Sequence, residues 1–290
     1  MRIDSVFQSR SAEGAIPVSF EMFPPKGELT LERAREAAGE LCALAPDFIS
    51  VTCSAGGSGN SGATADIAAM ITREFGVASV AHMTCVGLTD AMLRERMGAY
   101  RDAGVENVLA LRGDMPADAA DDAPAGDFSY AADIIPRLVD AGFCVGAAAY
   151  PEGHIDCDDL AVSVEHLKLK QDAGASFFVT QLFFDNEYFY RFRALAGKAG
   201  ITVPITAGIM PFMSKQQITR MVFMCGASLP SPVIKLLARY EDDPEGLRQA
   251  GIEYACRQLQ NLADNGVDGL HVYTMNRPGV ARAALEALGR

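Results

Sequence analysis

The chain has 290 residues, of which 49% are hydrophobic and 21% are charged, as is typical of a single globular domain. Its formal net charge of −12 argues against nucleic acid or an anionic membrane as a partner, because both bind basic surfaces. No apolar run reaches the ~18 residues of a membrane span, and the N-terminus lacks the apolar segment of a secretion signal, so we expect a cytoplasmic protein. The seven cysteines are scattered without a C-x-x-C pair, so we expect neither disulfides nor structural zinc.

Eight short β-prone runs follow one another along the chain, and most of them end at a polar or charged residue. They occupy residues 18–23, 48–53, 77–85, 107–114, 145–154, 177–185, 203–209 and 269–277. Stretches with helical periodicity lie between them, at residues 29–45, 89–104, 128–142, 160–174, 186–200 and 244–266. An extra short helix is expected within residues 229–246.

This alternation of strands and helices predicts parallel βαβ units. Eight such units predict an α/β fold, a (β/α)8 TIM barrel that forms a single domain over residues 1–290. The active site of such a barrel lies at the C-terminal ends of its strands.

Two carboxylates stand at the predicted strand ends, Glu21 in the first run and Asp114 in the fourth. Amide, hydroxyl and imidazole groups accompany them at Thr52, Tyr150, His154 and Gln181. Apolar neighbours suit Glu21 to the role of a general acid, although a side chain that faces solvent at a loop start explains it equally well. Asp114 can equally cap the loop that follows it. The residues by themselves predict a polar, acid-containing pocket and no particular reaction.

Three other features suggest chemistries that we reject. The G-x-G-x-x-G motif at residues 57–62 lacks the acidic residue that a dinucleotide-binding fold places about 20 residues later. The cluster at residues 154–159 has no partner histidine at a metal-binding spacing, so we expect no metal site. No lysine ends a predicted strand, which argues against a Schiff-base aldolase.

Nine segments at the strand ends and on one helix carry a family signature. They are SFEMFPPK (19–26), FISVTC (48–53), AHMTC (81–85), ALRGD (110–114), AAYPEGH (148–154), HLKLKQDAGA (166–175), TQLFFD (180–185), GIMP (208–211) and HVYTMNR (271–277). In this order and spacing they resemble the catalytic domain of methylenetetrahydrofolate reductase in its short bacterial form. The combination of FExFPP, LRGD and TQxFFD is highly specific, whereas each motif alone is weak.

The resemblance implies a flavoprotein that reduces methylenetetrahydrofolate to methyltetrahydrofolate and so supplies methyl groups for methionine synthesis. FAD would be the cofactor and NADH or NADPH the reductant, in a ping-pong reaction. Barrels of this kind commonly self-associate, so we expect a homo-oligomer. The regulatory domain of eukaryotic relatives has no counterpart after the barrel, so inhibition by adenosylmethionine is not expected.

The resemblance also assigns roles to individual residues. Glu21 corresponds to the general acid, and Asp114 to a carboxylate near the flavin and the pterin. The positions that correspond to FAD contacts are Thr52, His82, Arg112, Gly113, Asp114, Tyr130, Ala131, Tyr150, His154, His166 and Lys170. Folate contacts correspond to Gln181, Phe189 and Arg277. Without the resemblance, His82 is better explained as a core histidine, and helical spacing also places Phe189 on a core-facing side.

Three positions depart from the family pattern. Ser163 replaces an acidic residue of many relatives, Leu169 an arginine, and Met221 an aromatic residue. These departures weaken the expected contacts with FAD or with its reductant. Two alternatives therefore stay open: the same folate chemistry with electrons from a partner subunit, and a flavin-free methyltransferase barrel that binds methyltetrahydrofolate.

Overall fold

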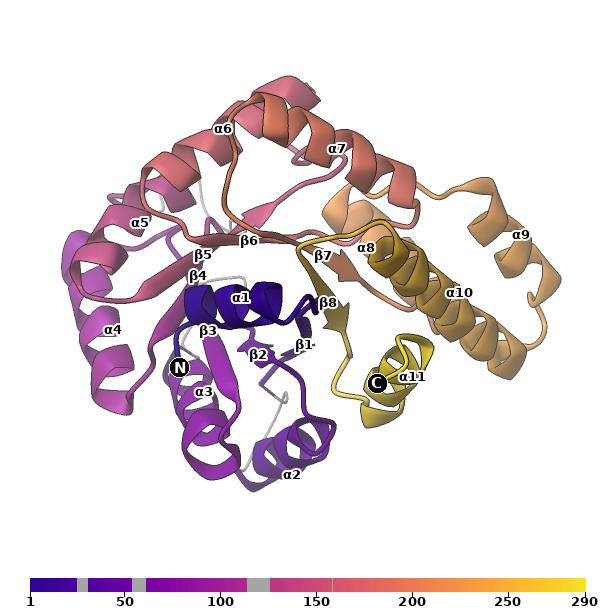
Figure 1. The fold of residues 1–290 in the computed structure, drawn as a ribbon, viewed down its shortest axis with the longest axis horizontal. Coiled ribbons are helices and arrows are strands. Elements are labelled where there is room, and N and C mark those ends of the chain that lie inside the picture. Colours follow the sequence, from indigo (N-terminus) through magenta and orange to yellow (C-terminus); the bar gives the residue numbers. More distant parts are fainter. Residues whose placement is uncertain (25–30, 54–60, 114–125, 158) are drawn as a thin grey trace.

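The computed structural model describes residues 1–24, 31–53, 61–113, 126–157 and 159–290. Eight parallel strands close into a barrel in chain order, and helices surround it (Figure 1). The strands are β1 (Val18–Met22), β2 (Phe48–Val51), β3 (Ala78–Thr84), β4 (Asn107–Leu111), β5 (Cys144–Ala149), β6 (Phe177–Thr180), β7 (Ile205–Ile209) and β8 (Gly269–Tyr273). Seven lie within a predicted run and β5 begins one residue before its run, so the predicted (β/α)8 barrel is confirmed.

The surrounding helices bury one face against the outside of the barrel. They are α2 (Leu31–Cys42), α3 (Ser61–Phe75), α4 (Asp90–Ala103), α5 (Ala131–Asp140), α6 (Leu160–Asp172), α7 (Asn186–Lys198), α10 (Pro244–Asp264) and α11 (Pro278–Ala287). Local sequence sets their ends: the Thr89 side chain caps the start of α4, and Gly104 ends it with a φ of 83°. Two further helices, α8 (Lys215–Cys225) and α9 (Ser231–Arg239), lie between β7 and α10, and α9 is the predicted extra helix.

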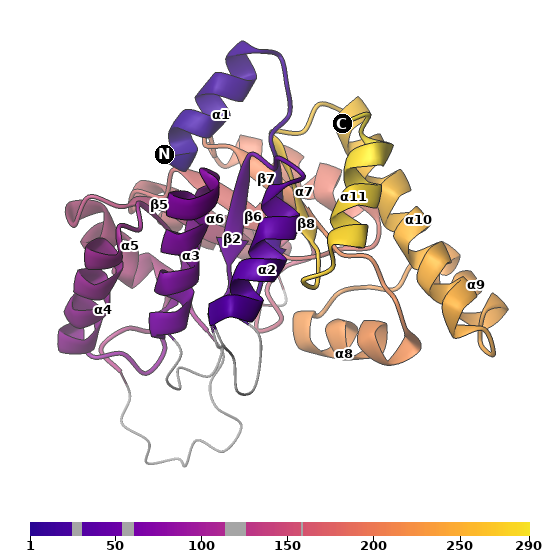
Figure 2. The ribbon, with the colours of Figure 1, turned by 90° about the horizontal axis from the view of Figure 1, so that it is seen from below.

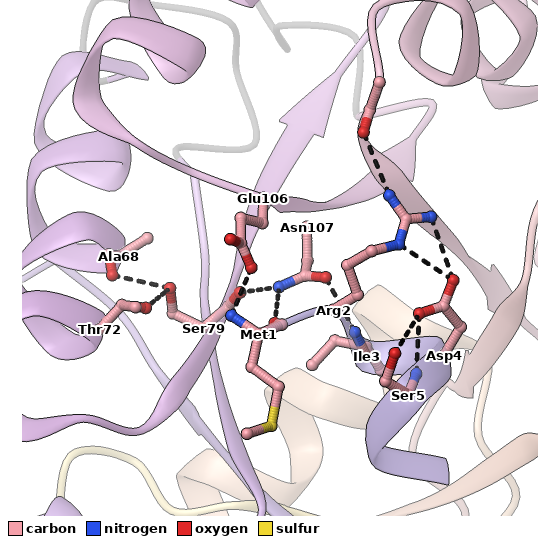
Figure 3. A network of polar contacts seen from close by, with 11 residues as sticks. Met1, Arg2, Ile3, Asp4, Ser5, Ala68, Thr72, Ser79, Glu106 and Asn107 are labelled. Atoms are coloured by element: carbon pink, nitrogen blue, oxygen red, sulfur yellow. Dashed lines mark hydrogen bonds and ion pairs between the residues drawn. The ribbon is translucent and has the colours of Figure 1, made fainter. Parts of the chain in front are cut away.

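A helix that the sequence did not predict closes the N-terminal end of the barrel. This helix, α1 (Ile3–Ala12), buries Ile3, Val6 and Phe7 against inward-facing strand residues. The Phe7 ring lies 6.3 Å from Phe48 and 6.1 Å from Phe177. Polar contacts also hold this helix, since the Ile3 amide donates to Asn107 Oδ1 at 2.9 Å (Figure 3). Figure 2 shows α1 at one end of the barrel and α8 toward the other, so a ligand would enter at the C-terminal ends of the strands.

No helix in the described part of the chain is long and apolar enough to cross a membrane.

Candidate active site

Glu21 lies near the C-terminal end of β1, at the mouth of the barrel. It is in register with Ser50 of β2 and Tyr273 of β8, so these three side chains project from the same face of the sheet. The Thr274 hydroxyl donates to the Glu21 carbonyl oxygen at 2.7 Å and fixes the strand end. The Glu21 side chain is 21% exposed, so a ligand can reach its carboxylate from the mouth.

Two buried histidines flank the Glu21 carboxylate. Glu21 Oε2 lies 3.8 Å from His271 Nε2 and 3.9 Å from His82 Nε2. Both nitrogens are buried and have no hydrogen-bond partner in the described part of the chain. These distances are longer than a hydrogen bond, so a small rotation of the carboxylate would be needed to form one. Burial lowers the pKa of His82 to about 4, so this imidazole is neutral near pH 7.

A hydrogen bond with Ser19 fixes the orientation of the His271 ring. Ser19 Oγ lies 2.8 Å from His271 Nδ1 and 3.2 Å from the Leu270 carbonyl oxygen. With its Nδ1 occupied in this way, His271 presents Nε2 toward Glu21. The mouth thus contains a carboxylate beside polar groups that can hold it, an arrangement that suits proton transfer.

A half-buried lysine and two aromatic rings extend the mouth toward β5 and α6. Lys170 Nζ donates to the Ala148 carbonyl oxygen at 2.8 Å and lies 5.3 Å from the centre of the Tyr150 ring. Tyr150 and His154 meet edge to face, with ring centres 4.7 Å apart. Burial lowers the pKa of Lys170 to about 8. Among the described residues no carboxylate forms an ion pair with Lys170, so its charge can meet an anionic ligand.

Arg112 and Gly113 follow β4 at the same end of the barrel. Arg112 Nη2 forms an ion pair with Asp156 Oδ2 at 2.8 Å, and the two side chains are 32% and 58% exposed. Such a solvated pair is weak, so a phosphate could displace the carboxylate. Gly113 has a φ of 84°, and an added Cβ would lie 2.9 Å from Thr84 Cβ. Asp114 lies outside the described residues, and so do residues 57–60 of the G-x-G-x-x-G motif at 57–62.

Other predicted residues are spread around the rim. The Thr52 carbonyl oxygen accepts a hydrogen bond from Thr64 Oγ1 at 3.0 Å. Tyr130 is exposed before the first turn of α5, Ala131 beside it is buried, and His166 is exposed on α6. Gln181 directly follows β6, is half-buried, and accepts a hydrogen bond from the Leu182 amide. Arg277 is exposed at the start of α11.

Phe189 differs from its predicted role as a folate contact. It is fully buried on α7, where its ring stacks on Phe183 at 5.6 Å. The aromatic residues at helical spacing pack in the core here. The Phe189 side chain is therefore not exposed to a ligand in this structure.

Two inward-facing residues of β8 were not assigned a role from the sequence. His271 contacts the Glu21 carboxylate, and Tyr273 stands beside it in register. Their alternation along the strand, as in H-V-Y, is the signal that could have placed both side chains inside the barrel.

Comparisons with known proteins agree with the motifs. The family model described as Methylenetetrahydrofolate reductase matches residues 6–289. The 5,10-methylenetetrahydrofolate reductase of Escherichia coli K12 is 33% identical over 288 residues, which cover 99% of this chain and 95% of the relative. Methylenetetrahydrofolate reductase (NADH) 1 of Arabidopsis thaliana is 32% identical over 302 residues, which cover 100% of this chain and 51% of the relative. This chain spans about half the length of the eukaryotic relatives that it matches.

A solved structure supports the fold independently. A protein from Clostridium thermocellum, described as binding two copies of 5-methyl-5,6,7,8-tetrahydrofolic acid, superposes with a TM-score of 0.64 at 13% identity. The superposition covers 97% of each chain. At this identity it shows the fold alone, whereas the family model and the bacterial relative cover nearly the whole chain. The chain therefore belongs to the methylenetetrahydrofolate reductase family of enzymes.

Proposed function

We propose that this protein reduces methylenetetrahydrofolate to methyltetrahydrofolate, with FAD as cofactor and NADH or NADPH as reductant. Family membership supports the reaction, and the name of the Arabidopsis relative, a methylenetetrahydrofolate reductase (NADH), supports NADH. The folate named for the Clostridium structure supports a folate ligand. The observation that carries the proposal is the partly exposed Glu21 carboxylate at the mouth, 3.8 and 3.9 Å from two buried histidine nitrogens.

The residues around the mouth fit FAD. Lys170 and Arg112 would bind its pyrophosphate, because the first has no carboxylate partner among the described residues and the second has only a solvated one. The absence of a side chain at Gly113 lets a ligand approach the backbone. The rings of Tyr150 and His154, and the side chains at Thr52, Tyr130 and His166, would bind the rest. When bound, FAD would accept a hydride from the nicotinamide and pass it to the folate, in ping-pong order.

The protein residues would prepare the folate for reduction. Glu21 would donate a proton to the folate's bridging ring and help to open it, and its buried neighbours would keep water away from the carboxylate. Gln181 would hydrogen-bond the pterin, and Arg277 would bind the distal part of the folate. Asp114 would stabilise the cation that ring opening produces. A cytoplasmic location and self-association stay predictions, and size-exclusion chromatography tests the second.

The Glu21→Gln variant tests the assignment. We expect it to bind FAD and to be bleached by NADH at the wild-type rate, because the change lies on the folate side of the reaction. We expect the folate half-reaction to slow by ~100-fold or more, the range for loss of a general acid. Stopped-flow absorbance of the flavin measures both steps separately. Wild-type folate reduction in this variant would contradict the role of Glu21.

A further inference from the structure

The contact between β6 and β7 is unusual in this barrel. Its register comprises two residue pairs, Phe178 with Ile205 and Val179 with Thr206, whereas each of the other seven strand interfaces comprises four. Beyond these pairs the Gly208 amide donates to the side chain Oγ1 of Thr180 at 2.8 Å. The backbone ladder is therefore replaced by a side-chain contact directly before Gln181.

A tyrosine from a third strand satisfies the Thr180 carbonyl oxygen that the shortened ladder leaves free. The Tyr273 hydroxyl, on β8, donates to Thr180 O at 2.6 Å. Burial is the main cause that raises the pKa of Tyr273 well above its usual range, so the phenol keeps its proton and remains a donor. A short hydrogen bond from a half-buried tyrosine thus ties β8 to the end of β6.

Glycine at position 208 makes this crossing over β7 feasible. An added Cβ would lie 2.8 Å from Tyr273 Cε2, 2.9 Å from the Tyr273 hydroxyl and 2.5 Å from Thr180 O. No side chain fits at those distances, so the ring of Tyr273 passes over bare backbone. Residues of β6, β7 and β8 thus meet at one contact. We name it the phenol latch, and it consists of Tyr273, Thr180 and Gly208.

The phenol latch connects the two sides of the mouth. Tyr273 is the register partner of Glu21, and Thr180 directly precedes Gln181. We propose that Tyr273 is a positioning residue that fixes Gln181 relative to Glu21, so that a pterin ring bound by the amide faces the acid. This inference rests on the proposed function. Tyr273 would bind no substrate atom itself, and its hydroxyl would act through the β6 strand end.

The Tyr273→Phe variant removes the hydroxyl and keeps the ring. Tyr100→Phe is the matched control, because its hydroxyl likewise donates to a strand carbonyl oxygen, that of His82, at 2.9 Å. Hydrogen–deuterium exchange on the purified protein, without substrate, measures how strongly the phenol latch protects the backbone amides of the β6 strand end. We expect peptides that cover residues 177–184 to exchange faster in Tyr273→Phe and at the wild-type rate in Tyr100→Phe.

Steady-state kinetics read the consequence for the site. We expect the KM for methylenetetrahydrofolate to rise about 3- to 10-fold in Tyr273→Phe, the range for one lost hydrogen bond, with bleaching of the flavin by NADH unchanged. A merely structural residue would lower the unfolding temperature and leave KM unchanged. Gly208→Ala is a second variant, which displaces the hydroxyl from the other side, and we expect the same pair of effects.

The outcomes separate this inference from the proposed function. Wild-type exchange across residues 177–184 in Tyr273→Phe, or an unchanged KM, would overturn the positioning role. If the wild-type protein fails to reduce methylenetetrahydrofolate, the proposed function fails and the positioning role with it, although faster exchange would still establish the latch as a structural contact.

Discussion

Replacing Lys170 with methionine tests how a half-buried cation at the mouth affects the free energy of unfolding. In the structure its ammonium group donates to the Ala148 carbonyl oxygen at 2.8 Å, and burial lowers its pKa from 10.5 to about 8. The unfolded chain therefore binds the proton more tightly than the folded chain does. We expect this cost to be fully present below pH ~8 and to diminish as the pH rises toward ~10.5, where the unfolded lysine also loses its proton.

The size of the effect follows from that pKa difference. At about 1.4 kcal/mol for each pH unit, the charged lysine costs the folded state on the order of 3 kcal/mol near neutral pH. Methionine removes this cost and retains most of the apolar contacts, but it cannot donate to Ala148, a loss of about 1 kcal/mol. We therefore expect Lys170→Met to raise the free energy of unfolding by about 2 kcal/mol near pH 7.

Urea denaturation without added FAD measures this difference. The gain should shrink strongly between about pH 7 and about pH 10, because wild-type Lys170 is then neutral in the fold. Lys168→Met is the matched control on the same helix, since Lys168 pairs with Asp172 near the surface and should show no comparable gain. The Lys170→Met variant should also bind FAD more weakly than wild type, because the proposed pyrophosphate contact is lost. A variant that is less stable than wild type near pH 7 would refute the reasoning.

Further predictions concern the free energy of unfolding, measured from urea denaturation curves. Asp47 is 4% exposed and accepts hydrogen bonds from the Val18 amide at 2.7 Å and from two arginines, so Asp47→Asn should destabilise by about 1–3 kcal/mol. An unchanged midpoint would show that these contacts contribute nothing. Gly251→Ala should cost about 1–3 kcal/mol, because an added Cβ would lie 1.7 Å from the Phe212 carbonyl oxygen. Gly197→Ala should instead stabilise by about 0.5–1 kcal/mol, because nothing lies within 4 Å of its added Cβ, and a loss there would contradict this account of α7.

Much of the fold is predictable from periodicity. Seven of the eight strands lie within the predicted β-prone runs, and β5 begins one residue before its run, because the strands are rich in buried apolar residues that alternate with helical stretches. The helix α1 was not predicted, because its three buried residues, Ile3, Val6 and Phe7, span little more than one turn. Its position at the N-terminal end of the barrel depends on packing with Phe48 and Phe177, which are far away in the sequence.

The candidate site is predictable only in part. Glu21 was singled out from its place at a strand end and from the family motif, but the approach of His271 depends on the register between β1 and β8. The phenol latch depends on the early end of the β6–β7 ladder, which no local pattern encodes. Phe189, which the family motif assigns to a folate contact, is buried in the core on α7, as its helical spacing alone predicts.

The measurement that tests the account most directly is the anaerobic visible spectrum of the purified protein. We predict a flavin absorption band that bleaches on addition of NADH or NADPH and returns on addition of methylenetetrahydrofolate. A flavin that neither nucleotide bleaches would favour electron delivery by a partner subunit. Ser163 and Leu169 would then be the first residues to replace with those of the family pattern. A protein that shows no flavin after incubation with FAD would contradict the proposed function and favour the methyltransferase alternative.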